Sequence, residues 1–402
     1  MKVAVLRETF PGERRVALVP DLIPLIAKVG WQVVVEAGAG QSAGFTDSDY
    51  LNKGAEIVAD RRAVIQQSEV VLQVRSLGAN PTEGRKDLDS FRRDQVLIGM
   101  CDPLGNPAAL RELADRGVIH FAMELIPRIT RAQSMDVLSS MATIAGYKAV
   151  LLAANHLPKL FPMLMTAAGT IKAAKVLVIG AGVAGLQAIA TSRRLGAIVQ
   201  AYDVRPAVKE QIESLGAKFI ELQLDTSQSE DKGGYAKQLT EDQVRQQQEQ
   251  LAKVVADCDV VISTAAIPGK PSPLLVTANA VRQMRPGSVI VDLAAERGGN
   301  CELSQADQTV VEQGVLILGP TNLAAEIPYH ASQMFAKNLV TFLLLLTNKE
   351  KQLEINLKDE VIRETLATKD GQVQNQRLRD MLYLGPLVKP PGSPPSDHLA
   401  DS

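Results

Sequence analysis

The chain has 402 residues, of which 46% are hydrophobic and 22% charged, and its formal net charge is −2. This size allows two globular domains with separate cores. The nearly balanced charge excludes an electrostatic argument for binding nucleic acid or an acidic membrane surface, so we expect no nucleic-acid partner. Cys101, Cys258 and Cys301 are far apart and lack CxxC spacing, and the four histidines are isolated. We therefore predict reduced, buried thiols and no metal site.

The first section of the chain alternates strand and helix signals. Apolar strand-like runs occupy 3–6, 32–36, 70–74, 96–99 and 118–121, with helical patterns such as 21–29 and 107–115 between them. This alternation predicts a doubly wound parallel sheet, although no glycine motif follows its first strand. Because the chain enters a strand at once, without a charged and then apolar leader, we expect a cytoplasmic protein.

Two apolar segments need to be weighed as membrane spans. The run 137–155 is long, but Lys148 lies in its middle and small residues dominate it, so it fits a long helix between domains better. The run 339–346 is shorter than the ~20 residues that a bilayer requires. We predict a buried helix there.

The most specific motif is the run from Val176 to Gly185, where three glycines follow an apolar strand with the spacing GxGxxG. Gly180 allows a sharp turn, Gly182 allows the backbone to approach a pyrophosphate, and Gly185 allows the following helix to pack close to the strand. The N-terminus of that helix favours phosphate. The alternative is a glycine turn that binds no nucleotide.

Asp203 strengthens the nucleotide interpretation. It lies 18 residues after Gly185, at the end of the next predicted strand. A carboxylate at this place accepts hydrogen bonds from an adenosine ribose and repels a 2′-phosphate, so NAD(H) is favoured over NADP(H). Arg205, two residues later, weakens that preference slightly.

Further strand-like runs complete a second α/β unit. They occupy 176–179, 198–202, 259–263, 288–292 and 315–318, and helices are expected at 327–347 and 359–368. We predict two doubly wound Rossmann-like domains with a cleft between them. Residues 1–136 with 327–380 form the first domain, 137–326 form the NAD(H)-binding domain, and 381–402 form a proline-rich flexible tail. The polar segment 226–237 predicts a long loop carrying Tyr235, or else a surface insertion with an incidental tyrosine.

Several motifs together resemble the family of alanine dehydrogenases and proton-translocating nicotinamide nucleotide transhydrogenases. They are Arg14-Arg-Val-Ala-Leu-Val-Pro20, Arg128-Ile-Thr-Arg-Ala-Gln133-Ser-Met-Asp136, the glycine motif with Asp203-Val-Arg205, Gly233-Gly-Tyr235-Ala, Ala266-Ile-Pro-Gly-Lys270 and Asp292-Leu-Ala-Ala-Glu-Arg-Gly-Gly299. The resemblance runs from residue 1 to about residue 380. Within the family, the chain is similar to the NAD(H)-binding component of the transhydrogenases.

The resemblance implies functional residues. Arg128, Gln133, Asp136 and Ser139 would hold the nicotinamide amide and its ribose, and Tyr235 would lie on a loop that closes over the site. The implied cofactor-binding residues are Ile129, Thr130, Gly180, Gly182, Val183, Gly185, Asp203, Val204, Arg205, Gly234, Gln248, Ala265 and Ile267. The alignment at Gln248 can slip by one residue in a glutamine-rich stretch, which is otherwise a solvated helix face.

Departures from alanine dehydrogenase separate the two branches. In that enzyme the resemblance implies a lysine and a histidine in the first domain and an aspartate beside the cofactor. Here Arg75 stands for the lysine, no histidine occurs near Cys101, and Glu296 stands for the aspartate. Because arginine cannot exchange a proton near neutral pH, we expect no amino-acid dehydrogenase chemistry.

A transhydrogenase component would pass hydride directly between NADH and NADP+ held on a partner. By resemblance the chain would form a homodimer and dock, at the inner face of a membrane, on a membrane-spanning subunit that translocates protons and on an NADP(H)-binding beta subunit. The alternatives are a stand-alone amino-acid dehydrogenase and a non-catalytic NAD(H) sensor. All three would bind NADH, so binding alone does not separate them.

Overall fold

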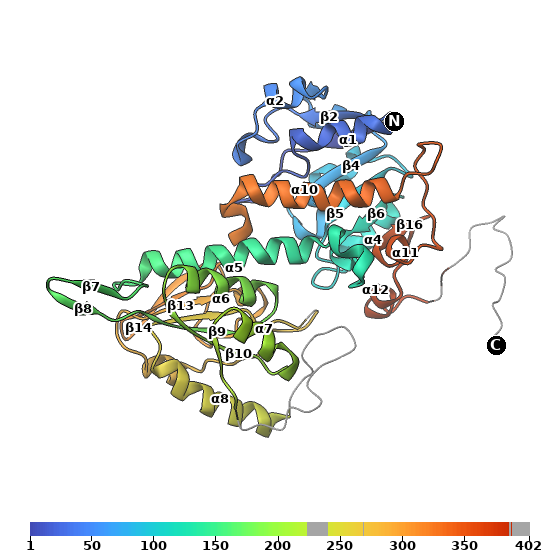
Figure 1. Cartoon of the computed structure of the whole chain (residues 1–402). Coiled ribbons are helices and arrows are strands. Elements are labelled where there is room, and N and C mark those ends of the chain that lie inside the picture. The colour runs from blue at the N-terminus through green and yellow to red at the C-terminus, as the bar shows by residue number, and fades with distance from the viewer. Residues whose placement is uncertain (223–239, 268, 386, 388–402) are drawn as a thin grey trace. The chain divides into compact units, whose positions relative to one another are not determined.

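The computed structural model describes residues 1–222, 240–267, 269–385 and 387. Its contacts divide the chain into two units, Met1–Val137 with Ser332–Ser402, and Leu138–Ala331. Each unit is built around its own sheet (Figure 1). The predicted fold class, two doubly wound α/β domains, is confirmed at the level of each unit.

Unit 1 contains an eight-stranded sheet in the order β17-β16-β6-β5-β4-β1-β2-β3. The bounds are β1 Lys2–Val5, β2 Gln32–Glu36, β3 Glu56–Val58, β4 Val70–Arg75, β5 Val96–Met100, β6 Ile119–Ala122, β16 Leu366–Lys369 and β17 Gln372–Val373. Strands β1 to β6 are parallel and follow the order 3-2-1-4-5-6, whereas β16 and β17 are antiparallel additions at one edge. This order is the doubly wound arrangement that alternating strands and helices predict.

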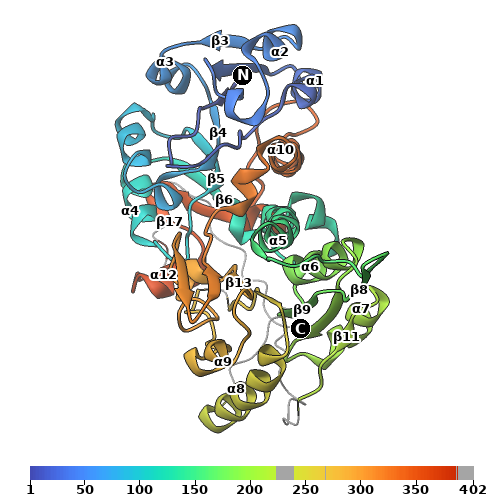
Figure 2. The same cartoon turned by 90° about the vertical axis from the view of Figure 1, so that its left-hand side faces the viewer.

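The helices of unit 1 cover this sheet. They are α1 Ile23–Lys28, α2 Asp47–Asn52, α3 Arg61–Gln66, α4 Ala108–Asp115, α10 Pro328–Leu345, α11 Glu360–Thr365 and α12 Gln376–Met381. Figure 2 shows α10 end-on, near β6. Helix α10 packs on β6, since the rings of Phe342 and Phe121 meet edge to face with centroids 5.2 Å apart. Leu339, Val340 and Leu343 are buried beside them. The buried helix predicted for 339–346 is therefore confirmed.

One predicted helix is wrong in its last turn. Helix α11 ends at Thr365, and the residues predicted to continue it form strand β16 against β6. Leu366, Ala367 and Thr368 are all buried, and Thr368 Oγ1 donates to the carbonyl of Val118 at 2.7 Å. The open edge of β6 offers hydrogen bonds that local helical propensity does not outweigh.

Unit 2 contains a seven-stranded sheet in the order β11-β10-β9-β12-β13-β15-β14. The bounds are β9 Lys175–Ile179, β10 Ile198–Tyr202, β11 Lys218–Phe219, β12 Val260–Ser263, β13 Val289–Asp292, β14 Thr309–Glu312 and β15 Val315–Leu318. Only β14 is antiparallel to its neighbour among these strands. The other six repeat the order 3-2-1-4-5-6, with β9 as the first strand.

The helices of unit 2 are α5 Val137–His156, α6 Val183–Arg194, α7 Lys209–Ser214, α8 Glu241–Ala256 and α9 Ala278–Arg282. Figure 2 shows α5 end-on beside α6. A Cβ on Gly146 of α5 would lie 2.1 Å from the carbonyl oxygen of Ala184 in α6, so only glycine permits this approach. Among the described helices, α5 alone is long and apolar enough to cross a membrane, which for a single helix is weak evidence. Its Ala149, Val150 and Ala153 lie in the core of unit 2.

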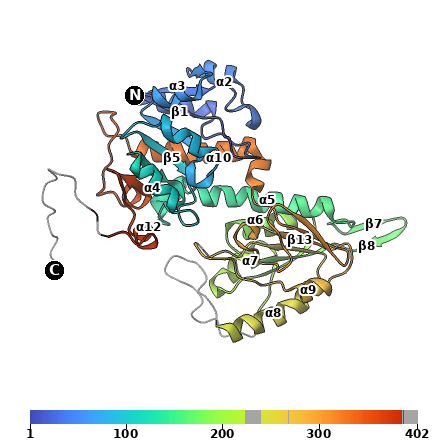
Figure 3. The ribbon, with the colours of Figure 1, turned by 180° about the vertical axis from the view of Figure 1, so that it is seen from behind.

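A short hairpin was not predicted from the sequence. Strands β7 Leu164–Thr166 and β8 Gly169–Ile171 pair antiparallel between α5 and β9. All six of their residues are exposed. The hairpin extends away from the sheet of its own unit (Figure 3).

Candidate functional site

The best candidate site of unit 2 lies where its strand order reverses. The chain passes from β9 to β10 on one side, and β12 lies on the other side of β9. In open α/β sheets, ligands bind at the carboxyl ends of strands at such a switch point. The glycine motif begins at the carboxyl end of β9, so Gly180, Gly182 and Gly185 of the predicted nucleotide site lie at this place.

The three glycines differ in what their surroundings permit. Gly180 has φ +93°, which favours glycine, and an added Cβ there would lie 2.8 Å from Thr264 Oγ1. A Cβ on Gly185 would lie 1.8 Å from the carbonyl oxygen of Gly180. A Cβ on Gly182 would meet nothing within 4 Å. The predicted sharp turn and close helix packing are thus present, while Gly182 borders open space that a ligand group can approach.

Helix α6 begins directly after this open position. Gly182 is its N-cap residue with extended backbone, and Val183 is its first residue and is 41% exposed. The first amide groups of a helix have no partner within the helix, and its dipole favours an anion there. The arrangement fits a phosphate group of a dinucleotide.

Asp203 follows β10 and is almost buried. Its Oδ2 accepts a hydrogen bond from the amide of Ala181 at 2.7 Å, which ties the carboxylate to the glycine turn. The side chain of Arg205 donates to both carboxylate oxygens, from Nε at 2.9 Å and from Nη2 at 2.8 Å. The Arg205 amide also donates to Oδ1 at 2.9 Å. The predicted ribose acceptor is therefore engaged in a bidentate ion pair.

The loop after β12 forms the other side of the switch point. Thr264 Oγ1 donates to the carbonyl of Gly180 at 3.0 Å, and the amide of Ala265 donates to Asn300 Oδ1 at 2.9 Å. Asn300 Nδ2 donates back to the carbonyl of Ala265 at 2.9 Å and to that of Pro273 at 2.8 Å. Ile267, the last predicted residue of this loop, is partly buried.

Asn300 and Asp292 are positioning residues that the sequence did not single out. Asp292 is fully buried at the end of β13, and its oxygens accept from Ser263 Oγ at 2.9 Å and from the amides of Asn300 and Cys301 at 2.8 and 3.0 Å. Asp292 begins the motif 292–299, and Asn300 directly follows it. Two polar residues around a glycine pair after a buried strand were the available signal.

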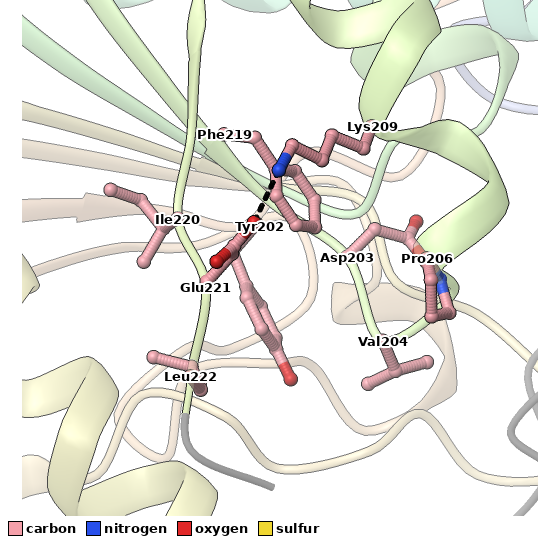
Figure 4. A pocket seen from close by; sticks show the side chains of 9 residues that line it. All are labelled: Tyr202, Asp203, Val204, Pro206, Lys209, Phe219, Ile220, Glu221 and Leu222. Carbon is pink, nitrogen blue, oxygen red and sulfur yellow. Dashed lines mark hydrogen bonds and ion pairs between the residues drawn. The ribbon is translucent and has the colours of Figure 1, made fainter. Parts of the chain in front are cut away.

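A cavity of about 230 Å³ opens beside Asp203 at the carboxyl ends of β10 and β11 (Figure 4). This volume is below the ~300–1,000 Å³ of most ligand pockets, so it suits one portion of a larger ligand. It is lined by Tyr202, Asp203, Val204, Pro206, Lys209, Phe219, Ile220, Glu221 and Leu222. Burial, together with the nearby Asp203 charge, raises the pKa of Tyr202 to about 12, and its hydroxyl accepts a hydrogen bond from Gln247 Nε2 at 2.8 Å.

The glutamine beside this wall is Gln247. It is buried, whereas Gln248 is only partly buried and donates to the carbonyl of Leu274 at 2.8 Å. The one-residue ambiguity of the glutamine-rich stretch therefore matters, and a cofactor role for Gln248 stays a prediction.

The predicted nicotinamide residues lie around the 3-10 helix Thr130–Met135 of unit 1. Arg128, Thr130 and Gln133 are exposed, whereas Ile129 and Asp136 are partly buried at its two caps. Ser139 lies in the first turn of α5 and is partly buried. Tyr235 and Gly234 fall outside the described residues.

Two contacts anchor this segment within unit 1. Arg131 makes a bidentate ion pair with Asp359, the N-cap residue of α11, at 2.8 and 2.9 Å. Asn338 Nδ2 of α10 donates to the carbonyl of Ser134 at 2.8 Å. Sequence reasoning missed both partners because each lies more than 200 positions away.

The switch point of unit 1, between β1 and β4, holds a different set of groups. Glu13 pairs with Arg15 at 2.6 Å and with Arg75 at 3.0 Å, and the Arg75 guanidinium lies 4.3 Å from the ring centre of Phe10. Burial raises the pKa of Glu13, but the hydrogen bond and charge of Arg15, with Arg75, bring it down to about 2. Arg75 is thus held in an ion pair with Glu13 and against the ring of Phe10.

Comparisons with known proteins show the family of the chain. Residues 4–145 match the family described as alanine dehydrogenase/PNT, N-terminal domain, and residues 149–376 match its C-terminal domain. A protein of Rhodospirillum rubrum that is named as the first part of NAD(P) transhydrogenase subunit alpha is 45% identical to this chain over 381 residues. The match covers 94% of this chain and 99% of that protein. Alanine dehydrogenase of Bacillus subtilis (strain 168) is 29% identical over 396 residues, 95% of each chain.

A solved structure of transhydrogenase from Sinorhizobium meliloti has a TM-score of 0.80 and 43% identity, and the match covers 94% of this chain and 100% of that one. The two family matches together span both units of the chain. The chain therefore belongs to the alanine dehydrogenase/PNT family, where it shares more sequence with the transhydrogenase alpha subunit than with alanine dehydrogenase.

Proposed function

We propose that the chain is the NAD(H)-binding subunit of a proton-translocating NAD(P)+ transhydrogenase. The observation that carries this proposal is the glycine turn at the switch point of unit 2, tied to Asp203 through the amide of Ala181. It occurs in a chain that is 45% identical to a transhydrogenase alpha subunit over nearly its whole length. The geometry supports NAD(H) binding, and the relatives' names indicate the reaction.

The residues of this chain would bind and orient NADH. The amides at the start of α6 and the open face of Gly182 receive the pyrophosphate, and Asp203 accepts from the adenosine ribose. Bound NADH supplies the hydride, which passes directly to NADP+ on a partner. Arg128, Gln133, Asp136 and Ser139 orient the nicotinamide and exclude water, with Tyr235 on a closing loop. No acid or base is required, because no proton moves in this step.

The partners follow from the same proposal. An NADP(H)-binding beta subunit presents the second nicotinamide, and a membrane-spanning subunit couples the reaction to proton translocation. The chain would then be a cytoplasmic protein attached to the inner face of a membrane through these subunits. The relatives' designation as an alpha subunit supports a complex of several subunits.

We further propose a homodimer, and the hairpin of β7 and β8 supports it. Met163 directly precedes the hairpin and Met165 lies on it; they are 58% and 80% exposed, and Leu164 and Ile171 are exposed too. A two-stranded hairpin is marginally stable alone in water, and an exposed apolar patch marks an association surface. We expect Met163→Ser with Met165→Ser to shift the protein from dimer to monomer in sedimentation experiments, whereas Val311→Ser, also exposed in unit 2, leaves the dimer intact. A monomeric wild-type protein would contradict the proposal.

The dehydrogenase alternative is disfavoured by the surroundings of Arg75. Its guanidinium cannot exchange a proton near neutral pH, and Glu13 and Phe10 hold it in place. Pyruvate, ammonium and NADH should therefore give no turnover with this chain.

Hydride transfer tests the proposed function. NADH and an oxidised NAD analogue are mixed with this chain and an NADP(H)-loaded partner domain, and each component is omitted in turn. We expect reduction of the analogue only in the complete mixture. Absence of transfer despite confirmed NADH binding and complex formation would favour the sensor.

A further inference from the structure

The Asp203–Arg205 pair raises a question about cofactor choice that the glycine motif leaves open. An ionised carboxylate offers about four acceptor positions. Four donors already occupy the acceptor positions of Asp203. They are the amides of Ala181 and Arg205, and Nε and Nη2 of the Arg205 side chain. Ribose hydroxyls can reach Asp203 only if the guanidinium gives up the two side-chain positions.

The same pair affects a cofactor that carries a 2′-phosphate. An arginine beside the ribose is the usual partner of that phosphate in NADP(H) sites. Here both donors face the carboxylate, and the side chains of Arg205 and Asp203 are only 16% and 6% exposed. A partly buried bidentate pair of this kind exceeds an exposed one in strength. Arg205 therefore donates to Asp203 and is withheld from a phosphate.

A second cation lines the adjacent cavity and is withheld in the same way. Lys209 of α7 forms an ion pair with Glu221, which follows β11, and both residues line the cavity that Asp203 also lines (Figure 4). Their side chains are 45% and 67% exposed, so this pair is weak. Its effect on phosphate affinity should be correspondingly smaller than that of the Asp203–Arg205 pair.

We propose that the Asp203–Arg205 and Glu221–Lys209 ion pairs together determine nucleotide specificity: each carboxylate withholds a cation from a 2′-phosphate, so the site accepts a free ribose and rejects NADP(H). This inference rests on the proposed NAD(H) site and adds Arg205 and Glu221 as specificity-determining residues. On NADH binding, Arg205 releases the carboxylate to the ribose. Loss of either carboxylate frees a cation for phosphate.

The test measures dissociation constants of NADH and NADPH for the full chain by fluorescence titration. Asp203→Asn leaves the Arg205 guanidinium without its carboxylate partner, so that the guanidinium can bind a 2′-phosphate. We expect the ratio of the NADPH dissociation constant to the NADH dissociation constant to fall by at least about 10-fold, which corresponds to ~1.4 kcal/mol. The double variant Asp203→Asn with Arg205→Met should lose the gain in NADPH affinity. If it keeps that gain, Arg205 is not the phosphate-binding cation.

Arg205→Met alone keeps Asp203 and the hydrogen bond that Asp203 accepts from the Ala181 amide. It therefore tests the proposal even if Asp203→Asn fails to fold. It should bind NADH at least as tightly as wild type and NADPH several-fold more weakly, because the carboxylate is no longer neutralised. Equal weakening for both cofactors would contradict the competition between Arg205 and the ribose.

Glu221→Gln should tighten NADPH binding about 2- to 5-fold, in line with an exposed pair. Glu210→Gln is the matched control, since Glu210 is exposed on the same helix as Lys209 but does not line the cavity. If Glu221→Gln and Glu210→Gln have the same NADPH affinity, the Glu221–Lys209 pair does not contribute to nucleotide specificity. Absence of NADH binding in the wild type would instead contradict the proposed function itself.

Discussion

Asn300 links three segments of unit 2 through one buried residue, since it bonds to Ala265, Pro273 and Asp292. Asn300→Ala removes three side-chain hydrogen bonds of about 0.5–1.5 kcal/mol each. We expect urea unfolding to show a loss of about 2–4 kcal/mol, and NADH binding to weaken because the loop after β12 loses its anchor. Asn356→Ala, in an exposed loop, is the control. A stable variant with normal NADH affinity would show that the loop holds its shape without Asn300.

Arg128 and Gln133 should act on orientation more than on affinity. Arg128→Ala or Gln133→Ala leaves the adenosine contacts intact, so we expect hydride transfer to slow far more than NADH binding weakens. Stopped-flow transfer rates and NADH titrations measure the two effects. Ser134→Ala, on the same 3-10 helix, retains the backbone carbonyl that Asn338 contacts and is the control. Equal losses of rate and affinity would argue against an orienting role.

Among the elements, α6 depends on glycines with separate tasks. Gly185→Ala would place a Cβ 1.8 Å from the carbonyl oxygen of Gly180, so we expect α6 to shift and the melting temperature to fall by several degrees. Gly182→Ala meets open space at φ −75°, so it should fold normally and lose at least about 10-fold in NADH affinity as the backbone is kept from the pyrophosphate. Thermal denaturation and NADH titration separate the variants. If Gly182→Ala binds NADH with normal affinity, the pyrophosphate does not lie against Gly182.

Element types were predictable where the pattern is local. The helix at 137–155 and the longer parallel strands of both sheets follow from apolar runs. The short parallel strands β3 and β11 were not predicted. Strand β16 and the hairpin of β7 and β8 were not predictable, because short runs carry little periodicity. In β16, pairing with β6 decides the conformation.

At the scale of the whole molecule, His120 should make stability depend on pH. It is fully buried on β6, its Nε2 lies 3.2 Å from Ser76 Oγ, and burial lowers its pKa to about 3. The folded state keeps the ring neutral, whereas the unfolded chain takes up a proton below its ordinary pKa of 6.5. Its contribution is therefore complete above pH 6.5 and is lost as the pH falls toward 3, by about 1.4 kcal/mol per pH unit.

His120→Gln retains a polar atom near Ser76 but does not titrate. Urea unfolding at about pH 7.5, 6 and 5 should show the wild type losing more stability than the variant as the pH falls. Parallel losses in the two proteins would assign the acid sensitivity to other groups.

The sequence by itself determined the class of fold, the place of the nucleotide motif and the family, because apolar periodicity, glycine spacing and short motifs are local properties. It also indicated that Asp203 favours NAD(H). Only the tertiary structure decided the partners of the polar and charged side chains. Arg131 pairs with Asp359, Arg75 pairs with Glu13, and Asn300 accepts a hydrogen bond from the amide of Ala265. These partners are distant in sequence, and the strand order that brings them together depends on packing across the whole sheet rather than on any one segment.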